Sequence, residues 1–324
     1  MNLGKTGSSF SFGPRGAKVT VGKNGVRKTV GIPGTGLSYT TYDKFGGSGS
    51  ASAGRSAHVP RNTVDVGFFA GLFMSGEEKT FVDAMKDLLR NDAPAAIRKL
   101  KQIPHLADAA FISAVLYLNN RQYDDCAVAI ENALANPDAL GTFFRKYNLD
   151  IDLSFPVTDV FSVNLQPCPL ALYLIKVEML QQKRDITQAC NILVALYRKD
   201  PGNLLVKISL SELILSVPAD PAWLNTLLNM TVNLENETPV HSVLLFYKGI
   251  VLKKLNLYDA AQTVLSAAGR KKKDRDPRLL LAIQEERADI CERQGHKSAA
   301  RKIWEKIYAE NPSHSRALRK INTL

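Results

Sequence analysis

The sequence predicts a mainly α-helical protein: an array of helical hairpins with a small antiparallel β meander at its N-terminus. Three observations carry this prediction. Glycine pairs recur every nine residues at the start of the chain, apolar residues follow helical spacing from about Val64, and small residues recur twelve positions apart in that second part. With 324 residues, 45% of them hydrophobic, the chain is long enough to bury a sizeable core.

Residues 1–42 are expected to form the meander. Short alternating runs such as Phe10-Ser11-Phe12 lie between the glycines, which favours strands. Asn-Gly is the strongest two-residue hairpin signal, so a turn at Asn24-Gly25 would pair Val19 with Val30, and a turn at Arg15-Gly16 would pair Phe12 with Val19. The glycine pairs are Gly4/Gly7, Gly13/Gly16, Gly22/Gly25 and Gly31/Gly34.

The stretch "GIPGTG" at 31–36 does not predict a phosphate site. Its G-x-x-G-x-G order reverses the dinucleotide fingerprint, no Lys-Ser/Thr follows it, and no helix is expected directly after it. We therefore expect no cofactor here, and the glycines are assigned to turns.

The segment resembles the bacterial domain of unknown function 4236. The resemblance rests on "NL" at 2–3, "GPRGAKVTVG" at 13–22 and "TVGIPGTGLSYT" at 29–40. Members of that family generally open with a further basic-aromatic stretch, so we expect this copy to be truncated or its start misplaced, with a clipped first strand and one unpaired sheet edge. The family brings no assigned chemistry.

The N-terminal segment is strongly basic. Residues 1–61 hold nine Lys and Arg against the single acid Asp43, which is +8 of the chain's net +11. Such a surface favours an acidic protein, a nucleic acid or an anionic membrane surface. The candidate basic surface comprises Arg15, Lys18, Lys23, Arg27 and Lys28.

Residues 43–63 are rich in Gly, Ser and Ala and are expected to be a flexible linker. Residues 64–324 are expected to be the helical repeat domain. An insert near 148–167 alternates in polarity around Thr158-Asp159, which predicts a β-hairpin or extended insert, and Pro156 implies an edge.

The helical part repeats one pattern: a small residue, a second small residue twelve later, then apolar residues four and seven beyond it. Ala288, Ala300, Trp304 and Ile307 are the clearest example, and Gly249, Ala261 and Leu265 another. Small residues let two antiparallel helices approach closely. The pattern resembles the tetratricopeptide repeat over roughly 77–137 and 170–312, and Tyr123 and Tyr258 match its inter-helix aromatic.

The tetratricopeptide resemblance implies that the first helix of each hairpin lines a groove for a partner peptide, although the apolar members of the expected lining could equally be core. The candidate groove residues are Phe111, Val115, Leu118, Leu174, Glu178, Phe246, Ile250, Lys253, Glu285 and Asp289. The acids Glu285, Glu286, Asp289 and Glu292 are expected to be a solvated face. The basic run "RKKKDR" at 270–275 is expected to be a solvated loop.

No motif indicates an enzyme. The five histidines do not stand at metal-ligand spacing, no nucleophile, zinc or nucleotide-binding motif is present, and we expect no catalytic residue, metal or cofactor. Four cysteines without a C-x-x-C favour reduced thiols in the cytoplasm. The apolar run 68–74 is too short to span a bilayer.

These observations predict a non-enzymatic protein–protein interaction scaffold that uses the helical-repeat groove and carries a tethered basic β-module. The alternative is a nucleic-acid or anionic-surface binding protein that acts through the basic N-terminal module.

Overall fold

The computed structural model describes strand segments 9–13, 17–22, 25–31 and 38–44 at the level of the backbone, and residues 74–158, 161–218 and 220–324. It divides into two compact units, Met1–Asp185 and Ile186–Leu324. Residues 45–63 of the expected linker 43–63, and residues 64–73 at the start of the expected helical domain, lie outside the described residues.

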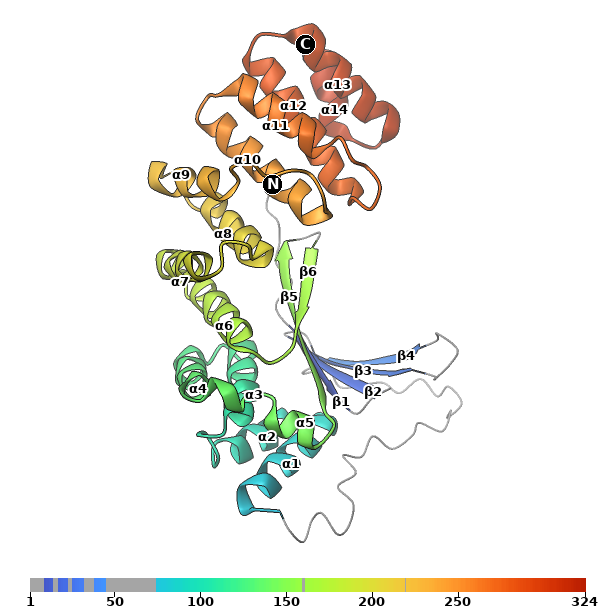
Figure 1. The fold of residues 1–324 in the computed structure, drawn as a ribbon. Coiled ribbons are helices and arrows are strands. Elements are labelled where there is room, and N and C mark those ends of the chain that lie inside the picture. Colours follow the sequence, from blue (N-terminus) through green and yellow to red (C-terminus); the bar gives the residue numbers. More distant parts are fainter. Residues whose placement is uncertain are drawn as a thin grey trace. The chain divides into compact units, whose positions relative to one another are not determined.

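The first unit combines helices with a sheet (Figure 1). Its helices α1 and α2 pair with each other, as do α3 and α4. The helices of this unit are α1 (Gly76–Leu89), α2 (Ala93–Leu100), α3 (Ala107–Asn119), α4 (Tyr123–Ala135), the 3-10 helix Pro137–Ala139, α5 (Thr142–Lys146) and α6 (Pro169–Gln182).

The sheet of the first unit has six strands in the order β4-β3-β2-β1-β5-β6, all neighbours antiparallel. The register places Phe12 opposite Val19 as expected. It places Val19 opposite Lys28 and not Val30, because Gly22 pairs with Gly25, whereas the expected turn would pair residue 23 with residue 26. The strands are β1 (Ser9–Gly13), β2 (Ala17–Gly22), β3 (Gly25–Gly31), β4 (Ser38–Lys44), β5 (Asp150–Thr158) and β6 (Phe161–Leu165).

The insert joins the N-terminal strands in one sheet. Strand β5 pairs with β6 as a hairpin and also with β1, where Phe12 stands opposite Ile151. The expectation of an unpaired edge at the first strand is therefore wrong, since β5 occupies that edge. Among the described residues, Ser154 is the last β5 residue paired with β1, so Pro156, which has no N–H, stands opposite no described residue of β1. Strand β4 extends to Lys44, two residues into the expected linker.

The second unit contains, among its described residues, only helices and their connections (Figure 1). Helices α10 and α11 form one hairpin and α12 and α13 the next. The elements are α7 (Ile186–Lys199), α8 (Leu204–Ser216), α9 (Pro221–Met230), α10 (Pro239–Lys254), α11 (Tyr258–Ala268), α12 (Pro277–Arg293), α13 (Lys297–Glu310) and α14 (Ser315–Thr323).

Local sequence explains where several helices begin. Asp220, Thr238 and Asp276 each cap a helix N-terminus through a side-chain oxygen that accepts a backbone N–H, and each is followed by proline at the first helical position. The cap satisfies a donor that the helix leaves unpaired, and proline has no N–H to leave unpaired.

The ends of the first helices repeat one geometry. A residue with positive φ stands seven positions after the first small residue of each expected repeat: Asn91, Arg121, Arg184, Asn256 and Gly295. In each case the N–H of the following residue bonds the carbonyl five positions before it, for example His296 N–H to Cys291 at 2.8 Å. This is the Schellman ending of a helix, and its recurrence supports a helical repeat.

The small residues that define the pattern lie where two helices meet. Ala84, Ala96, Ala114, Ala261, Ala288 and Ala300 are all fully buried. A Cβ built on Gly249 would stand 2.5 Å from Cγ and Cδ2 of Leu265 on α11, so only glycine fits at this crossing without a shift. No helix of the described residues has the length and apolar character that crossing a membrane requires.

Candidate functional site: a charged face on α10, α12 and α14

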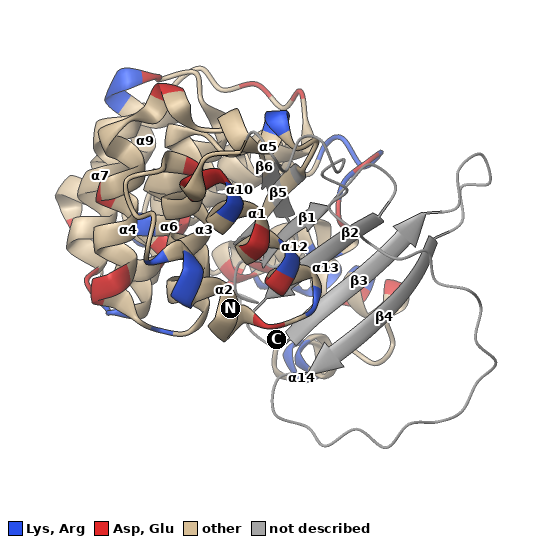
Figure 2. Ribbon diagram, turned by 90° about the horizontal axis from the view of Figure 1, so that it is seen from below, with Lys and Arg blue, Asp and Glu red and all other residues tan. Residues whose placement is uncertain are grey.

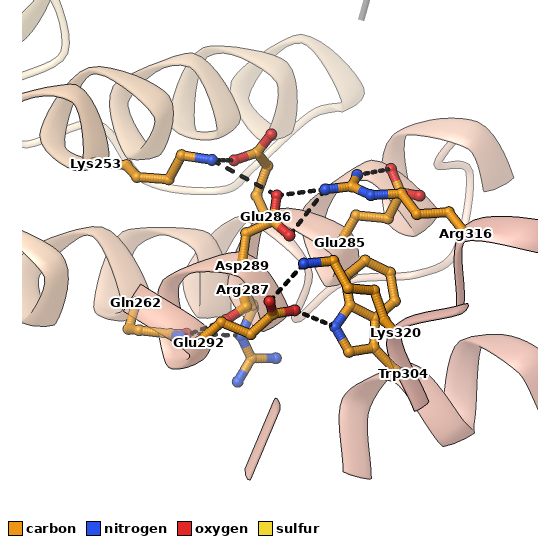
Figure 3. Close-up of polar contacts among 10 residues, drawn as sticks. All are labelled: Lys253, Gln262, Glu285, Glu286, Arg287, Asp289, Glu292, Trp304, Arg316 and Lys320. Atoms are coloured by element: carbon orange, nitrogen blue, oxygen red, sulfur yellow. Dashed lines mark hydrogen bonds and ion pairs between the residues drawn. The ribbon is translucent and has the colours of Figure 1, made fainter. Parts of the chain in front are cut away.

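The second unit carries a cluster of charged side chains from three helices (Figure 3). Residues 285, 289 and 292 of α12 follow the i, i+4, i+7 spacing that places side chains on one side of a helix. We call this cluster the charged face. Its members are Lys253 of α10, Glu285, Glu286, Asp289 and Glu292 of α12, His314 beside α14, and Arg316 and Lys320 of α14.

Two neighbouring helices form ion pairs with α12, through Arg316 of α14 and Lys253 of α10. The Nη2 atom of Arg316 donates to Oδ1 and Oδ2 of Asp289 at 2.9 and 2.7 Å. Lys253 donates to Glu286, and its Nζ lies 3.9 Å from Asp289. Asp289 therefore stands between a cation of α10 and a cation of α14, and Figure 3 shows both side chains directed at it.

Glu292 forms a second set of contacts, with α13 and α14. Its Oε1 accepts a hydrogen bond of 2.7 Å from Trp304 Nε1, and its Oε2 accepts one of 2.5 Å from Lys320. Burial alone would raise the pKa of Glu292, but the hydrogen bonds from Lys320 and Trp304 outweigh it and lower the pKa. The Arg316 guanidinium lies 5.2 Å from the centre of the buried Trp304 ring, a cation–π contact.

His314 connects the loop before α14 to the same cluster. Its Nδ1 accepts the backbone N–H of Ala317 at 3.1 Å and so caps α14. The ring proton is therefore on Nε2, which lies 2.9 Å from Glu285 Oε1 and donates to it. Glu285 is thus partnered by His314, with Arg316 Nη1 at 3.6 Å.

The four carboxylates of α12 were expected to form a solvated face, and the structure contradicts this expectation. Their side chains are only 18% exposed for Glu285 and Asp289, 19% for Glu292 and 24% for Glu286, and each has a cationic or ring N–H partner. Four carboxylates meet three formal cations, Lys253, Arg316 and Lys320. Chemically, such a face can exchange one of its ion pairs for a charged group of a partner. It holds no arrangement of a nucleophile with a base.

The structure brings together three of the candidate groove residues, Lys253, Glu285 and Asp289. Ile250 and Glu178 are half-buried. The remaining candidates are at most 6% exposed, because large apolar side chains at these positions fill the space between helices. Their assignment to an open groove is therefore corrected to core: Phe111, Val115, Leu118, Leu174 and Phe246.

The candidates also fall in different units. Glu178 and Leu174 belong to the first unit, whereas Lys253 and Asp289 belong to the second. The candidate basic surface, Arg15, Lys18, Lys23, Arg27 and Lys28, has no described side chains. Within the described part of the chain, no three His, Cys, Asp or Glu side chains are placed to hold a metal ion.

Sequence reasoning missed Arg316, Lys320 and His314, which follow the last recognised repeat. A signal was present: Arg316 and Lys320 are four residues apart, so they share one side of a helix, as do the acids of α12. The run 270–275 was expected to be a solvated loop, and residues 270–274 are exposed but Arg275 is not. Arg275 is buried and donates through Nε to Ser242 at 2.6 Å, so this residue has a structural role.

Comparison with known proteins adds a family match for the first residues. Residues 1–40 match the family model "Protein of unknown function (DUF4236)". No curated protein matches the chain. A similar solved structure is entitled "Structure of Naa15/Naa10 bound to HypK-THB", with 14% identity, a TM-score of 0.37 and coverage of 76% of this chain. The chain spans 39% of the length of that matched chain.

Proposed function

We propose that the protein is a non-enzymatic interaction scaffold of the tetratricopeptide-like type, and that the charged face binds a partner protein. The observation that carries this proposal is the convergence of Lys253, Asp289 and Arg316, which come from the first helices of two successive hairpins and from the following helix. A surface assembled from successive repeats suits an extended or helical segment, because such a segment can contact several helices at once.

The charges of this face support a role in specificity. Buried or half-buried ion pairs contribute little net stability, because desolvation offsets most of their attraction. Their more effective use is in selecting a partner of complementary charge. Since carboxylates outnumber formal cations by one here, a partner that presents Lys or Arg would restore the balance.

The alternative function, binding of a nucleic acid or an anionic surface, depends on Arg15, Lys18, Lys23, Arg27 and Lys28. Their side chains lie outside those described, so no contact of this structure favours it.

The test is an affinity capture from cells of the source organism with full-length protein and two charge-swapped variants. Asp289→Arg/Arg316→Asp reverses the central pair of the charged face. Arg301→Glu/Glu305→Arg reverses an exposed pair on α13 whose atoms lie 2.9 Å apart, and it serves as the matched control. We expect a partner that is retained by the control and lost by the first variant. Partners retained equally by all three proteins would contradict the proposal.

A further inference from the structure

A cavity of about 470 Å³ opens among α11, α12 and α13. Its volume is within the range of small-ligand pockets. Apolar side chains contribute much of the lining: Leu280, Leu281 and Ile283 of α12 and Ile303 of α13. Three of them, Leu280, Leu281 and Ile303, are only partly buried, so apolar surface is left open to solvent here.

The rim of this cavity is positively charged. Arg270, Lys272, Arg287 and Lys306 line it, against the single carboxylate of Glu310. Within the described residues none of these four cations forms an ion pair. Gln262 of α11 fixes one of them, since it accepts from Arg287 Nε at 3.2 Å and donates to the Arg287 carbonyl at 2.7 Å. Figure 3 shows the Arg287 guanidinium directed away from the carboxylates of the charged face.

A buried polar atom of the lining also lacks a partner. Oε1 of Gln284 on α12 is inaccessible to solvent and accepts no hydrogen bond from the described residues. A buried acceptor without a donor is costly, and a ligand that supplies an N–H would remove that cost. The cavity thus offers an apolar surface, unpaired cations and one unsatisfied acceptor.

We propose that this cavity binds a peptide segment of a partner protein that carries an apolar anchor residue flanked by Asp or Glu. The apolar surface would take the anchor and the cations would pair with the carboxylates. Rotation of the Gln284 side chain into the cavity would bring its Oε1 to a peptide N–H. This proposal rests on the scaffold function above and names a partner class for it. A single-stranded nucleic acid fits less well, because no aromatic side chain lines the cavity for bases to stack on.

The site is separate from the charged face. By helical spacing, residues 280, 284 and 287 share one side of α12, and residues 285, 289 and 292 share the other side. Figure 2 shows that the helices carry charges of both signs. A second cavity, of about 460 Å³, shares Arg270 but balances it and Lys271 with Glu235 and Glu237. It therefore offers no comparable preference for an acidic ligand.

The experiment selects a phage-displayed library of random twelve-residue peptides on the full-length protein. Enriched peptides are synthesised and titrated against two variants with the same change in net charge. Arg270→Glu/Lys306→Glu reverses two cations of the cavity. Lys297→Glu/Lys302→Glu reverses two exposed cations of α13 outside it. A single variant, Gln284→Leu, removes the unsatisfied acceptor, and circular dichroism verifies that all variants are folded.

We expect enriched peptides with an apolar residue beside Asp or Glu. Their Kd should rise about tenfold in the cavity variant and stay within about twofold in the control variant, as expected for the loss of two ion pairs. Affinity should weaken in Gln284→Leu and fall with added salt.

Three outcomes would overturn the cavity proposal: no enriched peptide, enriched peptides of basic composition, or equal affinity for both double variants. A fluorescent twelve-nucleotide single-stranded RNA is titrated in parallel, and RNA binding lost only in the cavity variant would assign the site to nucleic acid. The peptides are also titrated against the Asp289→Arg/Arg316→Asp variant. Affinity lost only in that variant would refute the cavity while leaving the scaffold function standing. Failure of every peptide and of the affinity capture would refute both.

Discussion

The buried carboxylate of Asp108 accepts a hydrogen bond of 2.7 Å from the backbone N–H of Phe143, which is 35 residues further along the chain. The N–H groups of Gly141 and Phe144 also donate to it. Helix α5 begins after Gly141, which has no side chain to cap it, so a residue of α3 satisfies its first donors. Because α5 leads directly into β5, this contact connects the helices of the first unit to the start of its hairpin.

Replacing Asp108 should destabilise the first unit. We expect Asp108→Ala to lower the free energy of unfolding by about 1–3 kcal/mol, since three N–H groups lose their acceptor. Asp138→Ala, an exposed acid on the 3-10 helix, is the control and should change little. Chemical denaturation followed by circular dichroism measures both. Equal stability of the two variants would show that α5 does not depend on this cap.

The crossing of α10 and α11 at Gly249 gives a second prediction. Gly249→Leu should cost about 1–3 kcal/mol because the new side chain meets Leu265, which is fully buried. Ala300→Leu, at the equivalent crossing of α12 and α13, should cost a similar amount. In a double-mutant cycle, Leu265→Ala should relieve part of the cost of Gly249→Leu. Purely additive costs, measured by thermal melting, would contradict a direct clash.

The lowered pKa of Glu292 predicts a contribution to stability that depends on pH. The folded protein holds this proton less tightly than the unfolded chain, whose ordinary value is 4.5. The contribution is therefore present above about pH 4.5 and is lost as pH falls through the lowered pKa. Glu292→Gln should reduce stability at pH 7 and flatten its decline between about pH 5 and 3. A decline as steep as that of the wild type, in urea unfolding at each pH, would remove Glu292 as its source.

Thiol chemistry should distinguish the four cysteines. Burial raises the pKa of Cys126 to about 12 and that of Cys190 to about 11, and it also raises the pKa of Cys291. Since the thiolate is the reactive form, these three should resist alkylation at pH 7.5, while the more accessible Cys168 reacts first. Iodoacetamide labelling followed by mass spectrometry measures the order, and fast modification of Cys126 in folded protein would contradict its burial.

The pairing of β1 with β5 can be tested by cross-linking. Phe12→Cys/Ile151→Cys places two thiols at directly opposed positions, so a disulfide should form on mild oxidation. Phe12→Cys/Asp152→Cys shifts one thiol by a residue, to the other face of the strand, and should not cross-link. Both variants carry Cys168→Ser. Cross-linking of the shifted pair alone would refute this register.

Features encoded by local spacing could be predicted from the sequence. Ala288, Ala300 and Trp304 indicated a helix crossing, and all three are fully buried. The polarity alternation at 148–167 likewise indicated the strands found there, because period two is a property of a few neighbouring residues. Tethering of the N-terminal module by a flexible linker stays a prediction, because residues 45–63 lie outside the described residues.

Features that depend on residues far apart could not be predicted. The pairing of β5 with β1 and the capping of α5 by Asp108 each join segments that are far apart in the sequence. Such contacts produce no periodic pattern among neighbouring residues. The groove assignment was wrong for residues such as Phe111 and Phe246, because helical spacing shows which residues share a face but not which face a neighbouring hairpin covers. The αL ending at Asn91, Arg121 and Arg184 was missed, since Arg gives no sequence signal for positive φ and Asn gives a weaker one than glycine.

The place of β5 between β1 and β6 has a consequence for how the protein is made. Ser11 pairs with Asp152, so about 140 residues must follow the first strand out of the ribosome before its partner exists, which takes roughly 7 to 28 s at ordinary elongation rates. During that interval β1 is a strand with an open edge, the kind of surface that joins foreign strands. The helical hairpins α1–α2 and α3–α4 close local contacts and are complete before β5 emerges. We therefore expect the helices of the nascent chain to form first. We expect β1 to be the segment that a ribosome-bound chaperone binds.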